Sequence, residues 1–247
     1  MPQPLNRAAP RAGIAIGQHS LSQRPKLAEL VAGTIGAWSY TELILGNLLS
    51  KMLGTSAPEA MAMYAAMGAF QPQMRALDAA AATAFADSDK DLYDATMFVV
   101  RRAAKQRHIF AHNVWATCPE LPEALLLVEP SVLWQWVAAV SAYQLEQLKQ
   151  PKGAATPMPL SVYQFDNSKV AVYRAEDFQN TIARINRAAL YVTWLSFLTP
   201  HPGPEGDSIR RLLRSETEIR SALDRSSRDQ TKQLSALPPM RVTTDVY

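Results

Sequence analysis

The chain has 247 residues and a formal net charge of +3, with a sequence pI of about 9.0. A balance this mildly basic does not by itself indicate nucleic-acid binding. Hydrophobic residues make up 48% of the chain, which is enough to form a sizeable core. The single cysteine, Cys118, excludes an intrachain disulfide and a cysteine-rich zinc site, and it suits a reducing compartment. We therefore expect a cytoplasmic protein.

The N-terminal 26 residues contain four prolines, two glycines and four cationic residues but no acid. Prolines and charges interrupt this segment too early for the apolar core of a secretory signal. It is typical of a disordered basic arm, so we place the first domain boundary between residues 26 and 27. No stretch of the chain reaches the ~18 apolar residues that a membrane helix needs. We therefore expect no membrane partner.

Apolar residues recur at helical spacing over residues 27–53, which predicts a long first helix that ends at Gly54. Ser56 is the expected N-cap of a second helix, with a kink or break near Pro72 and an alanine-rich continuation to Phe85. A third helix is expected over about 89–106. A short fourth helical segment would follow it and end near Trp115.

The pattern changes after Cys118. The apolar run 124–128 predicts a short strand, and 131–149 predicts a helix. Alternation with period two over 160–165 and 169–174, around a polar turn, predicts a β-hairpin near 160–174. A core helix is expected over about 176–199. Residues 201–247 are expected to form one exposed amphipathic helix, near 206–225, and a polar tail. The main domain would therefore span residues 27–200.

The most informative stretch is 107–112, where Arg107 stands five residues before His112 and His108 directly follows the arginine. Arginine can bind a phosphate through two parallel hydrogen bonds, and histidine can exchange a proton near neutral pH. This pair is the minimum set for cleaving a phosphodiester without a metal. No acid occurs between Asp94 and Glu120, so the nearby cations would attract a phosphate backbone; these are Arg101, Arg102 and Lys105. The alternative is a solvated helix face.

Helix geometry constrains this pair. Residues five apart on a regular helix point about 140° away from each other. Arg107 and His112 would therefore converge only if a helix starts or bends there, or if two copies of the chain each present their own pair. His108 and His112 do share a face, which raises a metal site with Cys118 as an alternative. The protease spacing is excluded because Ile109 stands where a glutamate is needed.

With a histidine directly after its arginine, the stretch 107–112 fits the signature R-x4-6-H of the HEPN family, an all-helical family rich in ribonucleases. The resemblance covers roughly residues 27–199 and places the motif after several helices, as in bacterial HEPN-like proteins of this size. The chain departs from the family at Asn113, where a small residue is common, and in the hairpin. The resemblance therefore implies a mainly α-helical HEPN-like bundle with a small appended β-hairpin.

What the resemblance implies for function is a metal-independent endoribonuclease without a cofactor, in a toxin or defence role. Its products would be 2′,3′-cyclic phosphate and 5′-hydroxyl ends. Arg107 would bind the scissile phosphate, His112 would act as general acid or base, and His108 would orient the pair. RNA is the expected substrate partner. The resemblance also implies a protein partner, which would be a second copy of this chain or another HEPN-containing chain. An antitoxin would be a further partner. The alternative is a non-catalytic HEPN-like module that binds protein or RNA.

Two further sets of residues are candidates. Asn113 is expected to bind RNA together with the three cations near the motif, Arg101, Arg102 and Lys105. Glu42 lies within the apolar stripe of the first helix, where a buried carboxylate needs a cationic or hydrogen-bonding partner. Arg107 or Arg102 would supply it, which would make Glu42 an orienting residue. If the helix is rotated, Glu42 meets solvent instead. No metal ligands are assigned.

Overall fold

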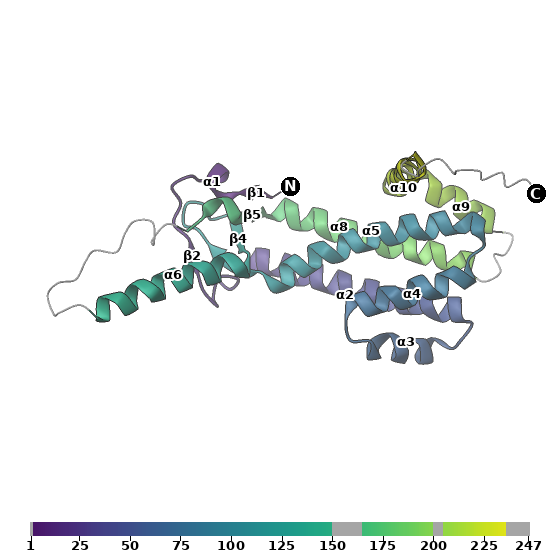
Figure 1. Ribbon diagram of the computed structural model, residues 1–247, viewed down its shortest axis with the longest axis horizontal. Coiled ribbons are helices and arrows are strands. Elements are labelled where there is room, and N and C mark those ends of the chain that lie inside the picture. Colours follow the sequence, from purple (N-terminus) through teal and green to yellow (C-terminus); the bar gives the residue numbers. More distant parts are fainter. Residues whose placement is uncertain (1, 150–164, 200–204, 236–247) are drawn as a thin grey trace, which may run out of the picture. The chain divides into compact units, whose positions relative to one another are not determined.

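The computed structural model describes residues 2–149, 165–199 and 205–235. The chain is mainly helical, as predicted, and its described part also contains a five-stranded antiparallel sheet (Figure 1). It divides into two compact units. The first comprises residues 1–39 and 103–186, and the second comprises residues 40–102 and 187–247. No helix in the described ranges combines the length and apolar character needed to cross a membrane.

The sheet belongs to the first unit, and its strand order is β1-β5-β4-β3-β2. The strands are β1 (Gln3–Pro4), β2 (Ala15–Ile16), β3 (Val114–Thr117), β4 (Ala124–Val128) and β5 (Val170–Arg174). The central strand β4 is buried along its whole length. Its even-numbered residues pack in one apolar cluster with Leu5, and its odd-numbered residues pack in another with Phe110 and Phe178. Apolar clusters therefore cover both faces of the sheet, which is why β4 is a continuous apolar run.

The helices of the first unit lie on these two faces. The helix α1 (Leu5–Ala8) supplies Leu5 to one cluster, and Leu133 of α6 (Pro130–Leu148) packs against the same cluster. Three long helices contribute their first-unit residues to the other cluster. They are α2 (Pro25–Leu53), α5 (Asp87–His112) and α8 (Ala175–Leu195).

The predicted disordered N-terminal arm is wrong. Residues 3–16 contain β1, α1 and β2, and the two strands form the two edges of the sheet. Leu5 is completely buried, and the Gly13 amide lies 3.4 Å from a carboxylate oxygen of Glu120. Strands of two residues are too short to show a periodic apolar pattern. The proline-rich composition alone therefore indicated disorder, which was wrong. Burial of the few apolar residues in this segment orders it.

The appended hairpin is also replaced by the larger sheet. The predicted second strand is present as β5, but it pairs with β4 along one edge and with β1 along the other. Residues 160–164 of the predicted first strand lie outside the described residues. The expected polar turn is a short 3-10 helix, η1 (Asn167–Lys169), in which the Asp166 side chain accepts a hydrogen bond from the Ser168 amide.

The second unit contains the remaining helices. Ser56 is the N-cap of α3 (Ala57–Ala66), as predicted, and it forms a capping box with Glu59. Gly68, at φ 65°, breaks the chain before α4 (Phe70–Ala84), so the break comes before Pro72 rather than at it. A positive φ of this size favours glycine, which explains the position of the break. A short 3-10 helix, η2 (Ser196–Leu198), follows α8.

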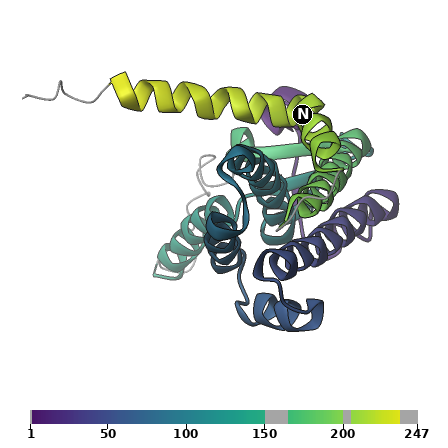
Figure 2. The same cartoon turned by 90° about the vertical axis from the view of Figure 1, so that its right-hand side faces the viewer.

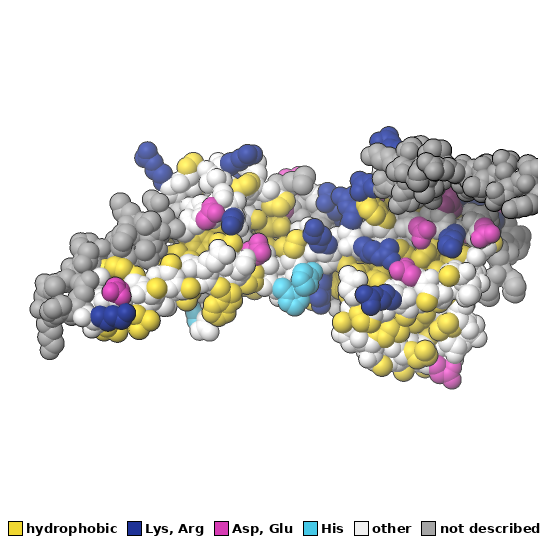
Figure 3. Space-filling view, in the orientation of Figure 1, with side chains coloured by type: hydrophobic (Ala, Val, Ile, Leu, Met, Phe, Trp, Pro, Cys, Tyr) yellow, Lys and Arg dark blue, Asp and Glu magenta, His cyan; other side chains and the backbone are white. Residues whose placement is uncertain are grey.

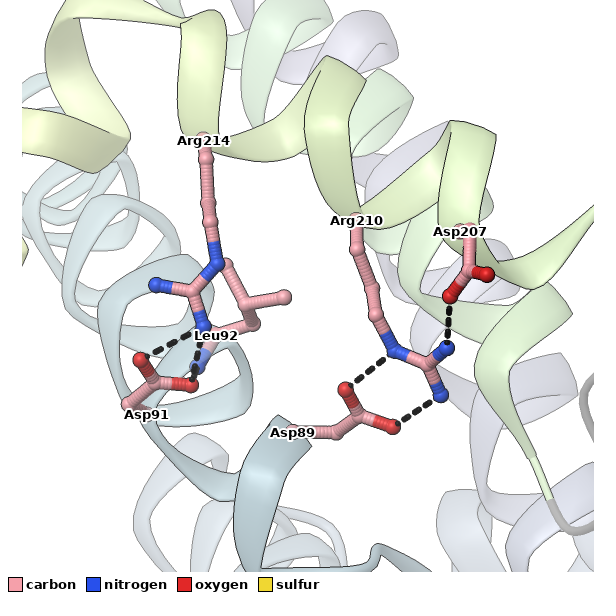
Figure 4. A network of polar contacts seen from close by, with 6 residues as sticks. All are labelled: Asp89, Asp91, Leu92, Asp207, Arg210 and Arg214. Atoms are coloured by element: carbon pink, nitrogen blue, oxygen red, sulfur yellow. Dashed lines mark hydrogen bonds and ion pairs between the residues drawn. The ribbon is translucent and has the colours of Figure 1, made fainter.

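The C-terminal segment is two helices rather than one exposed helix. They are α9 (Gly206–Ser215) and α10 (Thr217–Ser235), and Figure 2 shows α10 as a long helix running away from α9. Leu213 and Ile219 are completely buried, so both helices are anchored. The hydroxyl of Tyr191 donates a hydrogen bond to Glu216 between them. Two arginines of α9 also bind aspartates in the first turns of α5 (Figure 4).

Candidate functional site

The motif 107–112 forms the last turns of α5, which is one unbroken helix from Asp87 to His112. The two separate helices predicted for this region are therefore wrong. The helix contains no glycine or proline, so nothing in its sequence interrupts the backbone ladder. It ends where the Asn113 amide donates a hydrogen bond to the Ile109 carbonyl, and strand β3 begins at Val114.

Phe110 fixes the rotation of this end of α5. Its side chain is 1% exposed and lies among three aromatic rings of the first unit. The centroid distances are 5.8 Å to Trp115, 5.0 Å to Tyr173 and 5.3 Å to Phe178. The side chain of Gln106 also donates a hydrogen bond to the Tyr173 hydroxyl. This anchoring role was not predicted from the sequence, although Phe110 is an apolar residue between two histidines.

His108 and His112 are exposed and lie side by side on the opposite side of the helix from this aromatic cluster. Their ring centroids are 4.3 Å apart, as expected for residues four apart on a helix. Lys105 is three residues before His108, so it shares this face, and it is also exposed. Figure 3 shows histidine side chains gathered at the surface. The described part of the chain offers no carboxylate to Lys105 within ion-pair distance.

Arg107 is half-buried, and its environment is unusual for an arginine. Its Nε atom is buried without a hydrogen-bond partner. Among the described residues the guanidinium takes part in no hydrogen bond or ion pair. Buried charged donors are normally paired, because an unmade hydrogen bond to a charged group is costly. This cation is therefore free to bind an anion.

Arg107 and His112 do not converge through a bend in α5. The helix is regular to its end, so the two side chains leave it about 140° apart. His108 is at 100° from Arg107, also on another side. Arg107 and His112 could reach one phosphate through a break in the helix or through a second copy of the chain. Because the helix is unbroken, only the second arrangement remains.

The predicted phosphate-binding residues differ in their availability. Arg101, in the second unit, binds Asp78 through hydrogen bonds of 2.8 and 2.7 Å, and Tyr93 donates another to the same carboxylate. Burial is the main cause that raises the pKa of Tyr93, and the charge of Asp78 adds to it. Arg102 is exposed, with its guanidinium 5.9 Å from the Phe98 ring centroid. Arg101 is therefore occupied, whereas Arg102 is still accessible.

Two other predicted residues have different surroundings. Asn113 is half-buried and ends α5 through its backbone amide. Glu42 is half-buried in α2 within the second unit. Its charge is the second cause, after burial, that raises the pKa of Tyr64. The predicted role of Glu42 in orienting an arginine stays a prediction.

The alternative metal site of His108, His112 and Cys118 is not assembled. In the described ranges no three side chains of His, Cys, Asp or Glu come together as a metal-binding group. Cys118 is buried beside the sheet, and its thiol donates a hydrogen bond of 3.0 Å to Glu120. Burial is the largest cause that raises the pKa of this thiol, which disfavours the thiolate form that binds a metal.

Comparison with known proteins adds no relative to this description. No family model matches the chain, and no curated protein or solved structure matches it either. The chemistry of Arg107 and the two histidines is therefore the only functional indication in the described part of the chain.

Proposed function

We propose that this chain is a metal-independent endoribonuclease of the HEPN type, with Arg107, His108 and His112 as its catalytic residues. The observation that carries the proposal is the half-buried Arg107 guanidinium, which has no partner among the described residues. A half-buried cation without a partner suits a bound phosphate. The exposed histidine pair on the same two turns of helix supplies groups that can transfer protons.

In this proposal the ribose 2′-oxygen attacks the neighbouring phosphorus while the bond from phosphorus to the 5′-oxygen breaks. One imidazole removes the 2′-hydroxyl proton, and a protonated imidazole delivers a proton to the 5′-oxygen. Arg107 binds the phosphate and stabilises the charge that builds up on its oxygens. The products are a 2′,3′-cyclic phosphate and a 5′-hydroxyl. No metal step is needed.

The angle between Arg107 and His112 makes the proposal depend on a second copy. A single phosphate needs the cation and the proton-transfer group on neighbouring atoms. Because one unbroken helix separates them by about 140°, we propose that Arg107 of one copy acts with His112 of another. A HEPN-containing partner chain could take the same place. An antitoxin would then act by covering this surface.

A second candidate is a module that binds RNA without cleaving it. The same 140° separation favours this candidate, because a single copy offers a phosphate-binding cation without a convergent proton-transfer group. Cleavage separates the two functions. Mixed RNA incubated with the protein in EDTA should yield ends that carry a cyclic phosphate. The His112→Ala variant should lose this activity, whereas His19→Ala, which changes an exposed histidine outside the motif, should keep it.

Cleavage that requires a divalent ion, or that persists in His112→Ala, would contradict the nuclease. Binding that depends on Arg107 without any cleavage would favour the binding module.

A further inference from the structure

The helix α6 has an unusual composition for its position. It has 19 residues, of which only Glu146 is charged and only Val132 is buried. Figure 1 shows that its first turns lie beside the sheet of the first unit and that the rest extends beyond it. Three large apolar side chains are strongly exposed: Trp134 at 71%, Leu145 at 60% and Leu148 at 83%. Large apolar side chains left exposed along one helix mark an interaction surface.

The exposed residues follow a regular spacing. Trp134, Ala138, Ser141, Leu145 and Leu148 are separated by four, three, four and three residues, and all five are exposed. This is the 3.5-residue period of a helix that packs along a second helix. The half-buried side of α6 is a different stripe that includes Leu133 and Trp136. Helix geometry places Trp136 about 160° from Trp134, so the exposed stripe is not the one that holds α6 to its own unit.

We propose that this exposed stripe binds the same stripe of a second copy, with the two α6 helices antiparallel. The stripe is symmetric about its midpoint between residues 139 and 140. Large residues, Trp134 and Leu145, flank two small ones, Ala138 and Ser141. In an antiparallel pair Trp134 of one copy lies against Leu145 of the other, and the small residues meet where the helices cross. A self-complementary surface is what a two-fold dimer requires.

Charge supports the antiparallel direction. The charged pair Glu146 and Lys149 lies at one end of the helix, with 3.2 Å between its charged atoms. A parallel pair would place each of these charges beside its equivalent in the other copy, whereas an antiparallel pair puts the two sets at opposite ends. Opposed helix dipoles also favour this direction. Two helices of this length bury on the order of 1,000 Å² in total, so we expect a dimer that dissociates on dilution.

The first experiment measures self-association. Sedimentation of the full chain over a range of concentrations should show a species of twice the 27.2 kDa chain mass. The double variant Leu145→Glu, Leu148→Glu should raise the dissociation constant at least tenfold. Leu43→Glu is the control because it changes an exposed leucine, at 50%, on α2 and outside the α6 stripe. Both substitutions lie on exposed positions, so circular dichroism should show unchanged helix content.

The second experiment fixes the direction. Trp134→Cys protein mixed with Leu145→Cys protein should form an interchain disulfide on mild oxidation, because these positions face each other in the antiparallel pair and each lies about 16 Å along the helix from its own equivalent. Each variant alone should cross-link poorly, and the native chain, with only buried Cys118, should not cross-link. Strong cross-linking of either variant alone would indicate a parallel pair. A native chain that stays monomeric at every concentration would overturn the proposal.

This pairing does not rest on the proposed ribonuclease, which needs a second copy at the 107–112 surface rather than at α6. It uses α6, and the variants leave Lys105, Arg107 and both histidines unchanged. Loss of association without loss of RNA binding would therefore test the α6 surface alone.

Discussion

Arg210 of α9 binds Asp89 of α5 through two hydrogen bonds of 2.7 and 2.8 Å, and the Asp89 side chain is only 2% exposed (Figure 4). The guanidinium also binds Asp207, at 2.8 Å. These contacts raise the pKa of Arg210, with the hydrogen bond to Asp89 as the largest cause. A buried carboxylate is stable only while it is paired. This ion pair therefore attaches α9 to the first turn of α5.

Arg210→Met should destabilise the protein by about 2–3 kcal/mol, because it leaves the buried Asp89 charge without its partner. Arg214→Met is the matched control on the next turn of α9. Its partner is Asp91, and both side chains are about half exposed, at 46% and 45%. An exposed pair contributes less than about 1 kcal/mol. Denaturant unfolding should rank the two variants in this order. Equal losses of stability would show that the Asp89 pair has no special role.

Substitution of Arg107, the motif cation without a partner in the described ranges, tests the proposed phosphate-binding site. Arg107→Ala should lower the rate of RNA cleavage by about 10²–10³, the usual loss when a donor to a developing charge is removed. Arg107→Lys keeps the charge but loses the paired donors, so it should recover only part of the rate. Because the Nε atom has no partner among the described residues, folding should be little affected. A strongly lowered melting temperature would indicate instead that Arg107 holds the fold.

Mixing experiments test whether the site is shared between copies. Arg107→Ala protein and His112→Ala protein should each be inactive, and their mixture should recover up to about a quarter of the native activity per site if each site takes one residue from each copy. The expectation follows from the 140° separation along α5. The control is a mixture of Arg107→Ala protein with an Arg107→Ala, His112→Ala double variant, which should stay inactive. Recovery in that control would point to contamination rather than a shared site.

The salt dependence of RNA binding should separate the three cations near the motif. Each phosphate contact contributes about 0.7 to the logarithmic salt slope for single strands. Lys105→Gln and Arg102→Gln should each lower the slope by about this amount, since both cations are exposed. Arg101→Gln should change it less, because its guanidinium already binds Asp78 at 2.7 Å. Identical slopes for all four proteins would assign these residues to a solvated helix face.

The sequence predicted the elements that have a periodic apolar pattern. It did not predict the elements whose order depends on contacts with distant residues. The strand at 124–128 and the helices α2, α6 and α8 have enough repeating apolar positions to be recognised. The edge strands β1 and β2 have two residues each, so their order comes from pairing with distant strands. The unbroken α5 was missed for a different reason. The expected division near residue 106 had no glycine or proline to produce it.

The candidate site was predictable only in part. Residue types and spacing made Arg107 and His112 candidates, and they also predicted that the two would point apart on a regular helix. Whether Arg107 had a partner could not be predicted, because that depends on which acids the fold brings near. The pairing of Arg101 with Asp78 is the opposite case, since these residues are 23 positions apart and meet only through helix packing. The aromatic cluster around Phe110 likewise joins α5, β3, β5 and α8.

Cys118 should be almost unreactive in the folded protein. Its side chain is completely buried, and burial is the largest cause that raises the pKa of its thiol above the ordinary value. At pH 8 the thiolate fraction is therefore smaller than for a free cysteine, and reaction with a thiol reagent becomes appreciable only at higher pH. The same reagent should label the protein fully within minutes once it is unfolded in guanidinium. Cys118→Ala should lower stability by about 1 kcal/mol through lost packing, without changing RNA binding or cleavage. Rapid labelling of the native protein at pH 8, or loss of cleavage in Cys118→Ala with the fold retained, would show that this cysteine is more than a core residue.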